Sequence, residues 1–330
     1  MAGLRLTLAC GDYDRTRPLI DGRVKPEGID LNFVALSPEE IFWRQFQYKE
    51  FDASEMSMSS YIIQLARGEQ EFVAIPAFVS RFFRHGCIFV REGSGIHRPE
   101  DLRGKRVGVA EYQMTATVFI RGFLEHDYGV KPSEIHWFTG GQEQPGRKDR
   151  VEMSLPPDVR LDSIGDHKTL NQMLLDGELD ALIAARAPSG FHTHPEKIKR
   201  LFPDYPRVEQ EYFQRTGIFP IMHMVSIRRD VYEQHPWVAQ SLYKAFLEAK
   251  RICMHQMANT GTLSTSLPWQ IPELEKTKQV MGEDFWPYGV EENRVTLQAL
   301  LDYEYEQGLI QRRLAVEELF APNTLEEYKL

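Results

Sequence analysis

The chain has 330 residues, 42% of them hydrophobic and 26% charged, which is an ordinary balance for a globular protein of one large or two medium domains. Its formal net charge of -9 argues against partners such as nucleic acid or an anionic membrane, which carry charge of the same sign. No apolar run approaches the roughly 20 residues that a membrane helix needs. The N-terminal residues show no secretion signal, and the three separated cysteines fit no metal-binding spacing. We therefore expect a cytoplasmic protein with reduced thiols.

The first clear pattern is a short strand with Leu4, Leu6 and Leu8 on its buried face. Gly11 ends this strand, and Pro18 suits the first turn of a following helix. Between them the loop carries two acidic and two basic side chains: Asp12, Asp14, Arg15 and Arg17. Open α/β sheets bind ligands at such loops, and arginine grips carboxylates through paired hydrogen bonds. The pattern indicates a site for a small anion; a solvated turn with local ion pairs is the alternative.

Strand and helix patterns alternate through the first two thirds of the chain, which predicts an α/β architecture. Further strands are expected at 29–35, 51–56, 87–90, 106–109, 181–185 and 222–227. Helices are expected from 37 onward, at 61–67 and 115–128, and from 169 onward. The last third is mainly helical, at 236–257 and 291–307, and the apolar stripe of the first of these helices indicates core packing. The polar stretch 140–148 is expected to be an exposed insertion.

This order of elements resembles the two-lobed type II periplasmic-binding-protein-like fold, which is α/β and here has a helical C-terminal part. The stretch 101–109 resembles the entry into that superfamily's second lobe, and 174–181 resembles its recurrent helix-to-strand unit. The resemblance implies two lobes joined by crossing segments, with a ligand cleft between them. We expect the first lobe to comprise residues 1–92 and 222–330, and the second lobe residues 93–221.

Several stretches carry a closer resemblance, among them GDYDRTRP at 11–18, FDASEMS at 51–57, SRFFRH at 80–85 and EYQMTA at 111–116. Together with 40–44 and 318–322, they resemble the 4,5-dihydroxyphthalate decarboxylase family nearly end to end. The resemblance implies conversion of 4,5-dihydroxyphthalate to 3,4-dihydroxybenzoate (protocatechuate) and CO2 in phthalate degradation. The alternatives are a non-catalytic solute-binding protein for an aromatic carboxylate and an enzyme of the same fold with another substrate.

This reaction requires a base near the substrate's hydroxyl edge, an acid near the ring carbon and cations for two carboxylates. Deprotonation of the hydroxyl para to a carboxylate moves electron density to the carbon that bears it. Protonation of that carbon, followed by loss of CO2, restores aromaticity. The route needs no redox cofactor or electron sink. The histidines His192 and His194 lack a third ligand nearby, so neither a cofactor nor a metal is expected.

Three residues are predicted to transfer protons: His85, His223 and Glu111. Histidine titrates near neutrality and serves as either acid or base. Each of these residues has a structural alternative: a hydrogen-bonded histidine, or for Glu111 a helix cap where the dipole favours negative charge. Asp12 is an alternative acid.

The predicted substrate-binding residues share positions in loops or crossing segments: Asp12, Arg15, Arg17, Ser57, Ser59, Arg84, Tyr112, Gln113, Thr115 and Arg186. The two serines are equally suited to capping a helix. The expected partners are a small aromatic dicarboxylate and a second copy of the chain, which would pack on the tyrosine-rich helix at 291–307.

Overall fold

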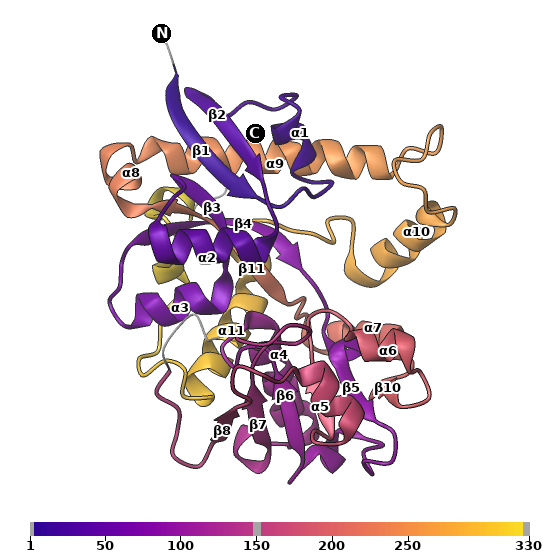
Figure 1. Ribbon diagram of the computed structural model, residues 1–330. Helices are drawn as coiled ribbons and strands as arrows, with labels where there is room; N and C mark the ends of the chain where they lie inside the picture. Colours follow the sequence, from indigo (N-terminus) through magenta and orange to yellow (C-terminus); the bar gives the residue numbers. More distant parts are fainter. Residues whose placement is uncertain (1–2, 148–152, 326–330) are drawn as a thin grey trace. The chain divides into compact units, whose positions relative to one another are not determined.

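The computed structural model describes residues 3–147 and 153–325 (Figure 1). The chain divides into two compact units, each with a sheet of its own. Unit 1 comprises Met1–Arg81, Ile221–Gln298 and Leu314–Leu330, and unit 2 comprises Phe82–Pro220 and Ala299–Arg313. This division differs from the predicted lobes mainly at 82–92 and 299–313, which both belong to unit 2. The first of these segments contains a strand of the second sheet, and the second carries Gln307, which bonds to Arg121 of unit 2.

The sheet of unit 1 has five strands in the order β2-β1-β3-β11-β4. They are β1 (Leu4–Cys10), β2 (Ile29–Ala35), β3 (Ala53–Ser57), β4 (Phe72–Arg81) and β11 (Ile221–Arg228). Strand β1 is parallel to β2 and β3, whereas β11 is antiparallel to β3 and β4. The chain steps outward from β1 to β2 and then back across β1 to β3. Right-handed crossovers therefore place the two connecting helices on opposite faces of the sheet.

The α-helices of unit 1 are α1 (Arg17–Ile20), α2 (Pro38–Tyr48), α3 (Met58–Ala66), α8 (Arg229–Gln234), α9 (Trp237–Met257) and α10 (Gln270–Met281). The division between the units falls within α11 (Arg294–Glu306). The 3-10 helices of unit 1 are η4 (Glu291–Asn293), η5 (Val316–Leu319) and η6 (Pro322–Thr324). Within residues 3–147 and 153–325, none of the helices combines the length and apolar character needed to cross a membrane.

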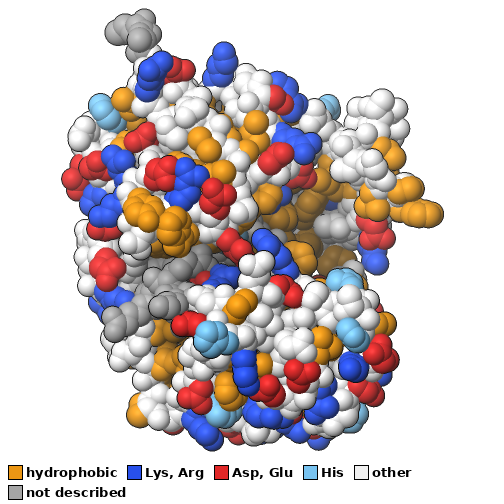
Figure 2. Space-filling model, in the orientation of Figure 1, with side chains coloured by type: hydrophobic (Ala, Val, Ile, Leu, Met, Phe, Trp, Pro, Cys, Tyr) orange, Lys and Arg blue, Asp and Glu red, His pale blue; other side chains and the backbone are white. Residues whose placement is uncertain are grey.

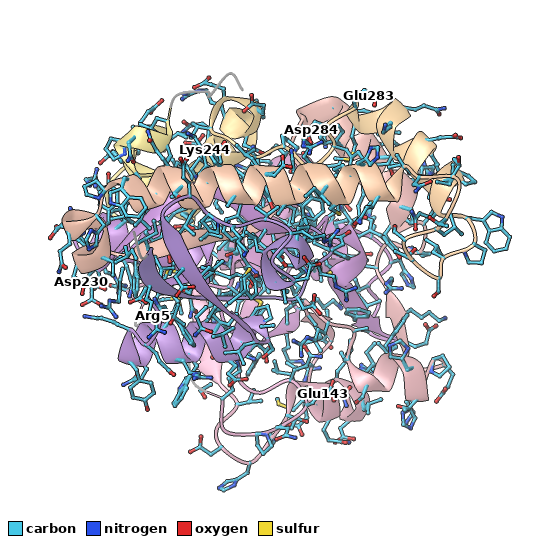
Figure 3. The ribbon with its side chains drawn as sticks, turned by 90° about the horizontal axis from the view of Figure 1, so that it is seen from above. Arg5, Glu143, Asp230, Lys244, Glu283 and Asp284 are labelled. Atoms are coloured by element: carbon cyan, nitrogen blue, oxygen red, sulfur yellow. The ribbon has the colours of Figure 1, made fainter. Side chains whose placement is uncertain are left out.

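Helix α9 packs against α1 and β4 (Figure 1). Its buried side chains recur at helical spacing: Val238, Leu242, Phe246, Ala249 and Cys253. The apolar stripe predicted for this segment is therefore core, as expected. Lys250 is also buried on α9, and its Nζ donates to Asp284 Oδ2 at 2.6 Å; Figure 3 labels Asp284 beside the helix.

The sheet of unit 2 has six strands in the order β10-β5-β9-β6-β7-β8. They are β5 (Ile88–Arg91), β6 (Arg106–Val109), β7 (His136–Thr139), β8 (Arg160–Ser163), β9 (Ala181–Ile183) and β10 (Ile198–Arg200). Its helices are α4 (Thr115–Tyr128), α5 (Leu170–Asp176), α6 (Ser189–Thr193) and α7 (Tyr205–Thr216), with η1 (His85–Cys87), η2 (Pro99–Leu102) and η3 (Pro132–Glu134). Strand β6 is parallel to both of its neighbours, β7 and β9.

The α/β prediction is confirmed, and the elements predicted at 29–35, 106–109 and 115–128 have the predicted limits. Helix α3 begins at Met58, three residues earlier than predicted, and Ser57 at the end of β3 is its N-cap residue. Ser37 is likewise the N-cap residue of α2, and neither serine side chain makes a capping hydrogen bond. Strands β4, β7, β8 and β10 and helices α6, α7, α8 and α10 were not predicted from the sequence.

Candidate active site

In unit 1 the carboxyl ends of β1 and β3 lie side by side, because the two strands are parallel neighbours. The chain leaves β1 toward β2 and leaves β3 toward β4, which lies on the other side of the sheet. Open α/β sheets bind ligands at such a topological switch point. The loop predicted to bind an anion, 11–17, follows β1 at this point, and Ser57 ends β3 there.

A buried glutamate, Glu55 of β3, is the centre of this region. Its carboxylate accepts hydrogen bonds from the Gly11 N–H at 2.8 Å, the Tyr13 hydroxyl at 2.7 Å and His223 Nδ1 at 2.6 Å. Burial acts to raise the pKa of Glu55. The hydrogen bond and charge of His223, together with the bonds from Tyr13 and Gly11, outweigh burial and hold the pKa below its usual value. Glu55 is therefore a buried anion.

His223 stands on β11, directly opposite Ser57 of β3. An ionised carboxylate can only accept hydrogen bonds, so whenever the imidazole carries a single proton, Glu55 requires that proton on Nδ1 and leaves Nε2 as the acceptor. Phe42 of α2 meets the imidazole edge-on, with ring centroids 4.8 Å apart, and this contact also fixes the ring. The His223 side chain is 19% exposed, so a small ligand can touch it. The result is an oriented histidine of the kind used in general acid–base catalysis.

Tyr13 approaches Glu55 closely because residue 11 is glycine. A Cβ atom at Gly11 would lie 2.5 Å from Cζ of the Tyr13 ring, which is closer than any real contact. Burial, followed by the charge of Glu55, raises the pKa of Tyr13. The phenol therefore keeps its proton and donates a hydrogen bond to the carboxylate. Gly11 and Tyr13 therefore each donate a hydrogen bond that stabilises the Glu55 carboxylate.

Arg15, predicted to bind a carboxylate, is held by several protein contacts. Its Nε donates to the Val79 carbonyl at 2.8 Å. The guanidinium lies over the rings of Tyr13 and Trp286, with its central carbon 4.4 and 4.3 Å from their centroids. These contacts fix the cation beside the switch point, and its role in substrate binding stays a prediction.

The other predicted binding residues of unit 1 lie near the carboxyl ends of β1 and β3. Arg17 is exposed, and its Nε donates to Asp12 Oδ1 at 2.9 Å. Ser57 is the N-cap residue of α3, where its Oγ accepts from Ser60 Oγ at 3.3 Å. Ser59 is buried in the first turn of the same helix. Their contacts with substrate stay predictions.

In unit 2 the switch point lies between β6 and β9, because the chain goes from β6 to β7 on one side and later returns to β9 on the other. The predicted residues that follow these strands include Glu111, Gln113, Thr115 and Arg186. The buried Glu111 carboxylate accepts from Gln113 Nε2 at 3.2 Å through Oε2. Its Oε1 accepts from Arg147 Nε at 2.9 Å and Nη2 at 2.5 Å. Thr115 is the first residue of α4 and is buried.

Two further predicted residues of unit 2 are held within the protein. Tyr112 is buried, with its ring 3.7 Å from the central carbon of the Arg121 guanidinium and edge-on to Trp137. Arg84 is buried, and its Nη1 donates to the Ala185 carbonyl at 3.4 Å. Both contacts indicate packing roles, and the binding roles of these residues stay predictions.

His85 lies in an aromatic cluster of unit 2. Its buried ring stacks on Phe123, with centroids 4.1 Å apart and planes inclined by 12°, and Phe202 and Tyr212 meet it at steeper angles. Burial, followed by the charge of Arg215, lowers the pKa of His85 to about 4. Within the described parts of the chain its Nδ1 has no hydrogen-bond partner. This environment favours a neutral packing residue, and the predicted proton-transfer role stays a prediction.

The environment of His85 predicts a specific pH dependence of stability. The pKa is about 4 in the folded state and 6.5 in the unfolded state, so the unfolded state binds the proton more tightly. The free energy of unfolding should therefore fall by about 3 kcal/mol from this residue as pH drops from 6.5 to 4. His85→Phe keeps an aromatic ring and should remove this loss, as measured by urea unfolding across the window. Equal pH slopes for both proteins would contradict this assignment.

No group of three or more His, Cys, Asp or Glu side chains able to hold a metal ion occurs in residues 3–147 and 153–325. His192 lies in α6, and His194 is that helix's C-cap residue.

Sequence reasoning missed three residues of the two switch points: Tyr13, Glu55 and Arg147. Glu55 had a usable signal, because it is a carboxylate within a short strand whose other predicted positions are mostly apolar or small. Arg147 had none, because it lies in an irregular polar stretch with no periodic pattern.

A family model described as NMT1/THI5 like matches residues 24–145. A curated 4,5-dihydroxyphthalate decarboxylase of Comamonas testosteroni is 42% identical over 330 residues, covering 100% of both chains. A protein of the same name from Pseudomonas putida is 43% identical over 214 residues, covering 65% of this chain and 83% of that relative.

Two solved structures show the fold. The periplasmic aliphatic sulphonate binding protein SsuA of Escherichia coli has a TM-score of 0.53 and 14% identity, with 98% of this chain and 99% of that chain covered. A periplasmic sulfonate-binding protein SsuA of Methylobacillus flagellatus KT has a TM-score of 0.57 and 14% identity, with coverages of 98% and 93%. These likenesses confirm the predicted periplasmic-binding-protein-like fold.

Proposed function

The chain belongs to the 4,5-dihydroxyphthalate decarboxylase family, and from this premise we propose that it converts 4,5-dihydroxyphthalate to 3,4-dihydroxybenzoate and CO2. The observation that carries the proposal is the 42% identity to a protein of that name across all 330 residues. The fold alone does not decide between reaction and capture, because solute-binding proteins share it.

The pair of Glu55 and His223 supports a reaction rather than simple capture. A solute-binding protein needs cations for its ligand but no group that transfers a proton, whereas the reaction requires one. In the proposal, His223 Nε2 exchanges the proton on which the reaction depends. The Glu55 anion stabilises the imidazolium that forms when Nε2 accepts a proton, and it holds the ring in one tautomer.

The reaction then balances without an added electron carrier. A base removes the proton from the hydroxyl para to the leaving carboxylate, and the electron pair moves through the ring to the carbon that bears this carboxylate. That carbon takes a proton, the bond to the carboxylate breaks, and its electron pair restores the aromatic ring and the phenolate. The leaving carboxylate should be held less tightly than its neighbour, because uniform binding would lower KM without raising kcat.

Cations for the two carboxylates are part of the same proposal. Unit 1 offers Arg15 and Arg17 on the loop after β1, and unit 2 offers Arg84 and Arg186 near the end of β9. Hydroxyl and amide side chains near the same strand ends would orient the remaining substrate oxygens: Ser57, Ser59, Gln113 and Thr115.

The direct test is to incubate the purified protein with 4,5-dihydroxyphthalate and to measure 3,4-dihydroxybenzoate by liquid chromatography and CO2 by trapping. We expect one CO2 for each product molecule. Phthalate is the matched control, because it has both carboxylates but lacks the hydroxyls that supply the electron density. It should bind without reacting. Stabilisation of the protein by 4,5-dihydroxyphthalate, with the compound recovered intact after metal supplementation, would favour a solute-binding protein instead.

The remaining parts of the proposal are a cytoplasmic location and assembly with a second copy of the chain. Acidic and basic side chains are interspersed over the face in Figure 2, which suits a small-molecule partner better than a polyanion. Cell fractionation and light scattering test the location and the assembly, respectively.

A further inference from the structure

We propose that Arg147 is a substrate-binding residue, which pairs with a carboxylate of the substrate while Glu111 holds its guanidinium in place. The inference rests on the proposed function, because it names the side chain of unit 2 that recognises the diacid. It also gives a role to the polar stretch around residue 147, for which the sequence suggested none.

The loop that carries Arg147 is firmly attached to unit 2. The Gly141 carbonyl accepts from the Leu170 N–H at 2.9 Å, at the start of α5. The Glu143 carboxylate, labelled in Figure 3, accepts from the N–H and the Oγ of Ser189 at 2.9 and 2.7 Å. A Cβ atom at Gly141 would lie 1.6 Å from the Gln144 carbonyl oxygen, so the tight turn requires glycine. Arg147 therefore follows a loop that hydrogen bonds and a tight turn hold on unit 2.

The position of the loop in the sheet is that of a ligand-binding loop. It follows β7, whereas Glu111 follows β6, and these two strands are parallel neighbours. Their carboxyl ends form the edge at which open α/β sheets bind ligands. The N-terminus of the 14-residue helix α4 also lies at this edge, and its dipole favours a negatively charged ligand.

Burial separates the roles of the two partners. The Glu111 side chain is 2% exposed, whereas that of Arg147 is 27% exposed. Arg147 contacts Glu111 through its Nε and Nη2 atoms, and both meet the carboxylate oxygen Oε1. Because Arg147 is the more exposed partner, an incoming molecule meets the cation before the carboxylate. Guanidinium recognises carboxylates through a planar fork of N–H donors, so a substrate carboxylate is the ligand that fits.

A second observation concerns Gln113, which donates to the other oxygen of Glu111. Gln113 is fully buried, and its Oε1 has no hydrogen-bond partner within the described residues. A carbonyl oxygen in this state needs a donor. The hydroxyls of the proposed substrate are donors, so the cluster of Arg147, Glu111 and Gln113 matches a molecule with both carboxylate and hydroxyl groups.

The test compares Arg147→Gln with Arg147→Lys and with the control Arg103→Gln. Arg103 also pairs with a glutamate, Glu134, but precedes β6 and so lies at the opposite end of that strand. We expect Arg147→Gln to raise KM for 4,5-dihydroxyphthalate by roughly 10- to 100-fold, which is the usual contribution of a charge-assisted hydrogen bond. Arg147→Lys should recover part of this loss because it keeps the charge without the fork. Arg103→Gln should leave KM unchanged, and circular dichroism establishes that all variants are folded.

Glu111→Gln separates positioning from proton transfer. If Glu111 is a positioning residue, the substitution should raise KM while leaving the shape of the kcat–pH profile unchanged. If kcat instead fell by roughly 10²-fold or more at constant KM, with one limb of the profile lost, Glu111 would transfer a proton and the inference would be overturned.

Calorimetric titration with phthalate and benzoate keeps the inference distinct from the proposed function. The wild-type protein should prefer the dicarboxylate, and Arg147→Gln should lose most of this preference. An unchanged phthalate Kd in Arg147→Gln would overturn the inference even if the wild-type protein is an active decarboxylase. A raised Kd without any wild-type turnover would support the inference and contradict the proposed reaction. Absence of phthalate binding by the wild-type protein would overturn both.

Discussion

His223→Asn is expected to lower kcat for 4,5-dihydroxyphthalate by roughly 10²- to 10⁴-fold, the usual contribution of general acid–base catalysis. The asparagine amide can still donate to Glu55, as Nδ1 of the histidine does, but it offers nothing that can exchange a proton at the position of Nε2. The buried carboxylate therefore keeps a donor and the fold is preserved. Steady-state kinetics measure kcat, and calorimetry measures the affinity for phthalate, which should change only a few-fold.

The control for this variant is His255→Ala, which removes an exposed histidine of α9 and should leave kcat unchanged. A His223→Asn variant with wild-type kcat would remove His223 from the mechanism. A variant that loses affinity and rate in the same proportion would instead show that His223 contributes to substrate binding.

Glu55→Gln should affect both the rate and the stability. The two Glu55 oxygens accept hydrogen bonds from Gly11, Tyr13 and His223. Glutamine replaces one of these oxygens with an NH2 group, which is a donor, so at least one of the three donors loses its acceptor. Each buried group left without its partner costs about 1–3 kcal/mol. The imidazole also loses the anion that fixes its tautomer, so kcat should fall by roughly 10²- to 10⁴-fold. Urea unfolding and steady-state kinetics on the same preparation measure both effects.

The pH dependence of this variant follows from the direction of the Glu55 shift. The pKa of Glu55 is lowered in the folded state, so its contribution to stability is present above the unfolded value of 4.5 and is lost as pH falls through the folded value. Glu55→Gln should lose less stability than the wild-type protein on acidification below pH 4.5. Glu69→Gln, at an exposed position after α3, is the matched control. If Glu55→Gln were as stable and as active as this control, Glu55 would have no role in orienting His223.

The elements that sequence reasoning predicted well are those whose pattern is local. The helix at 115–128 and the strand at 106–109 show their periodicity within one short window, and both have the predicted limits. Strand β4 was missed, and it contains Pro76, a residue that is found in strands mainly at sheet edges. The structure places β4 at the edge of its sheet, which only the complete strand order shows.

The candidate site was harder to predict because its contacts are long-range. Glu55 and His223 are 168 residues apart, and they meet only because β11 pairs with β3. Nothing near either residue in the sequence indicates the other. The surroundings of His85 are also set by long-range contacts, because Phe123 and Tyr212 of distant helices pack against its ring, and its role in proton transfer stays a prediction. Residue type and local position therefore identified candidates, and the strand order determined which of them meet.

The insertion of β11 between β3 and β4 has a consequence for synthesis on the ribosome. Residues 82–220 are translated after β4 and before β11, which takes on the order of 10 s at about 5–20 residues per second. Until β11 is made, residues 1–81 lack the strand that separates β3 from β4. The apolar side chains and backbone hydrogen-bond donors that β11 would cover then remain exposed. All six strands of the unit 2 sheet are translated during the same interval. We therefore expect the newly made chain to be most prone to aggregation before β11, the strand that carries His223, is translated.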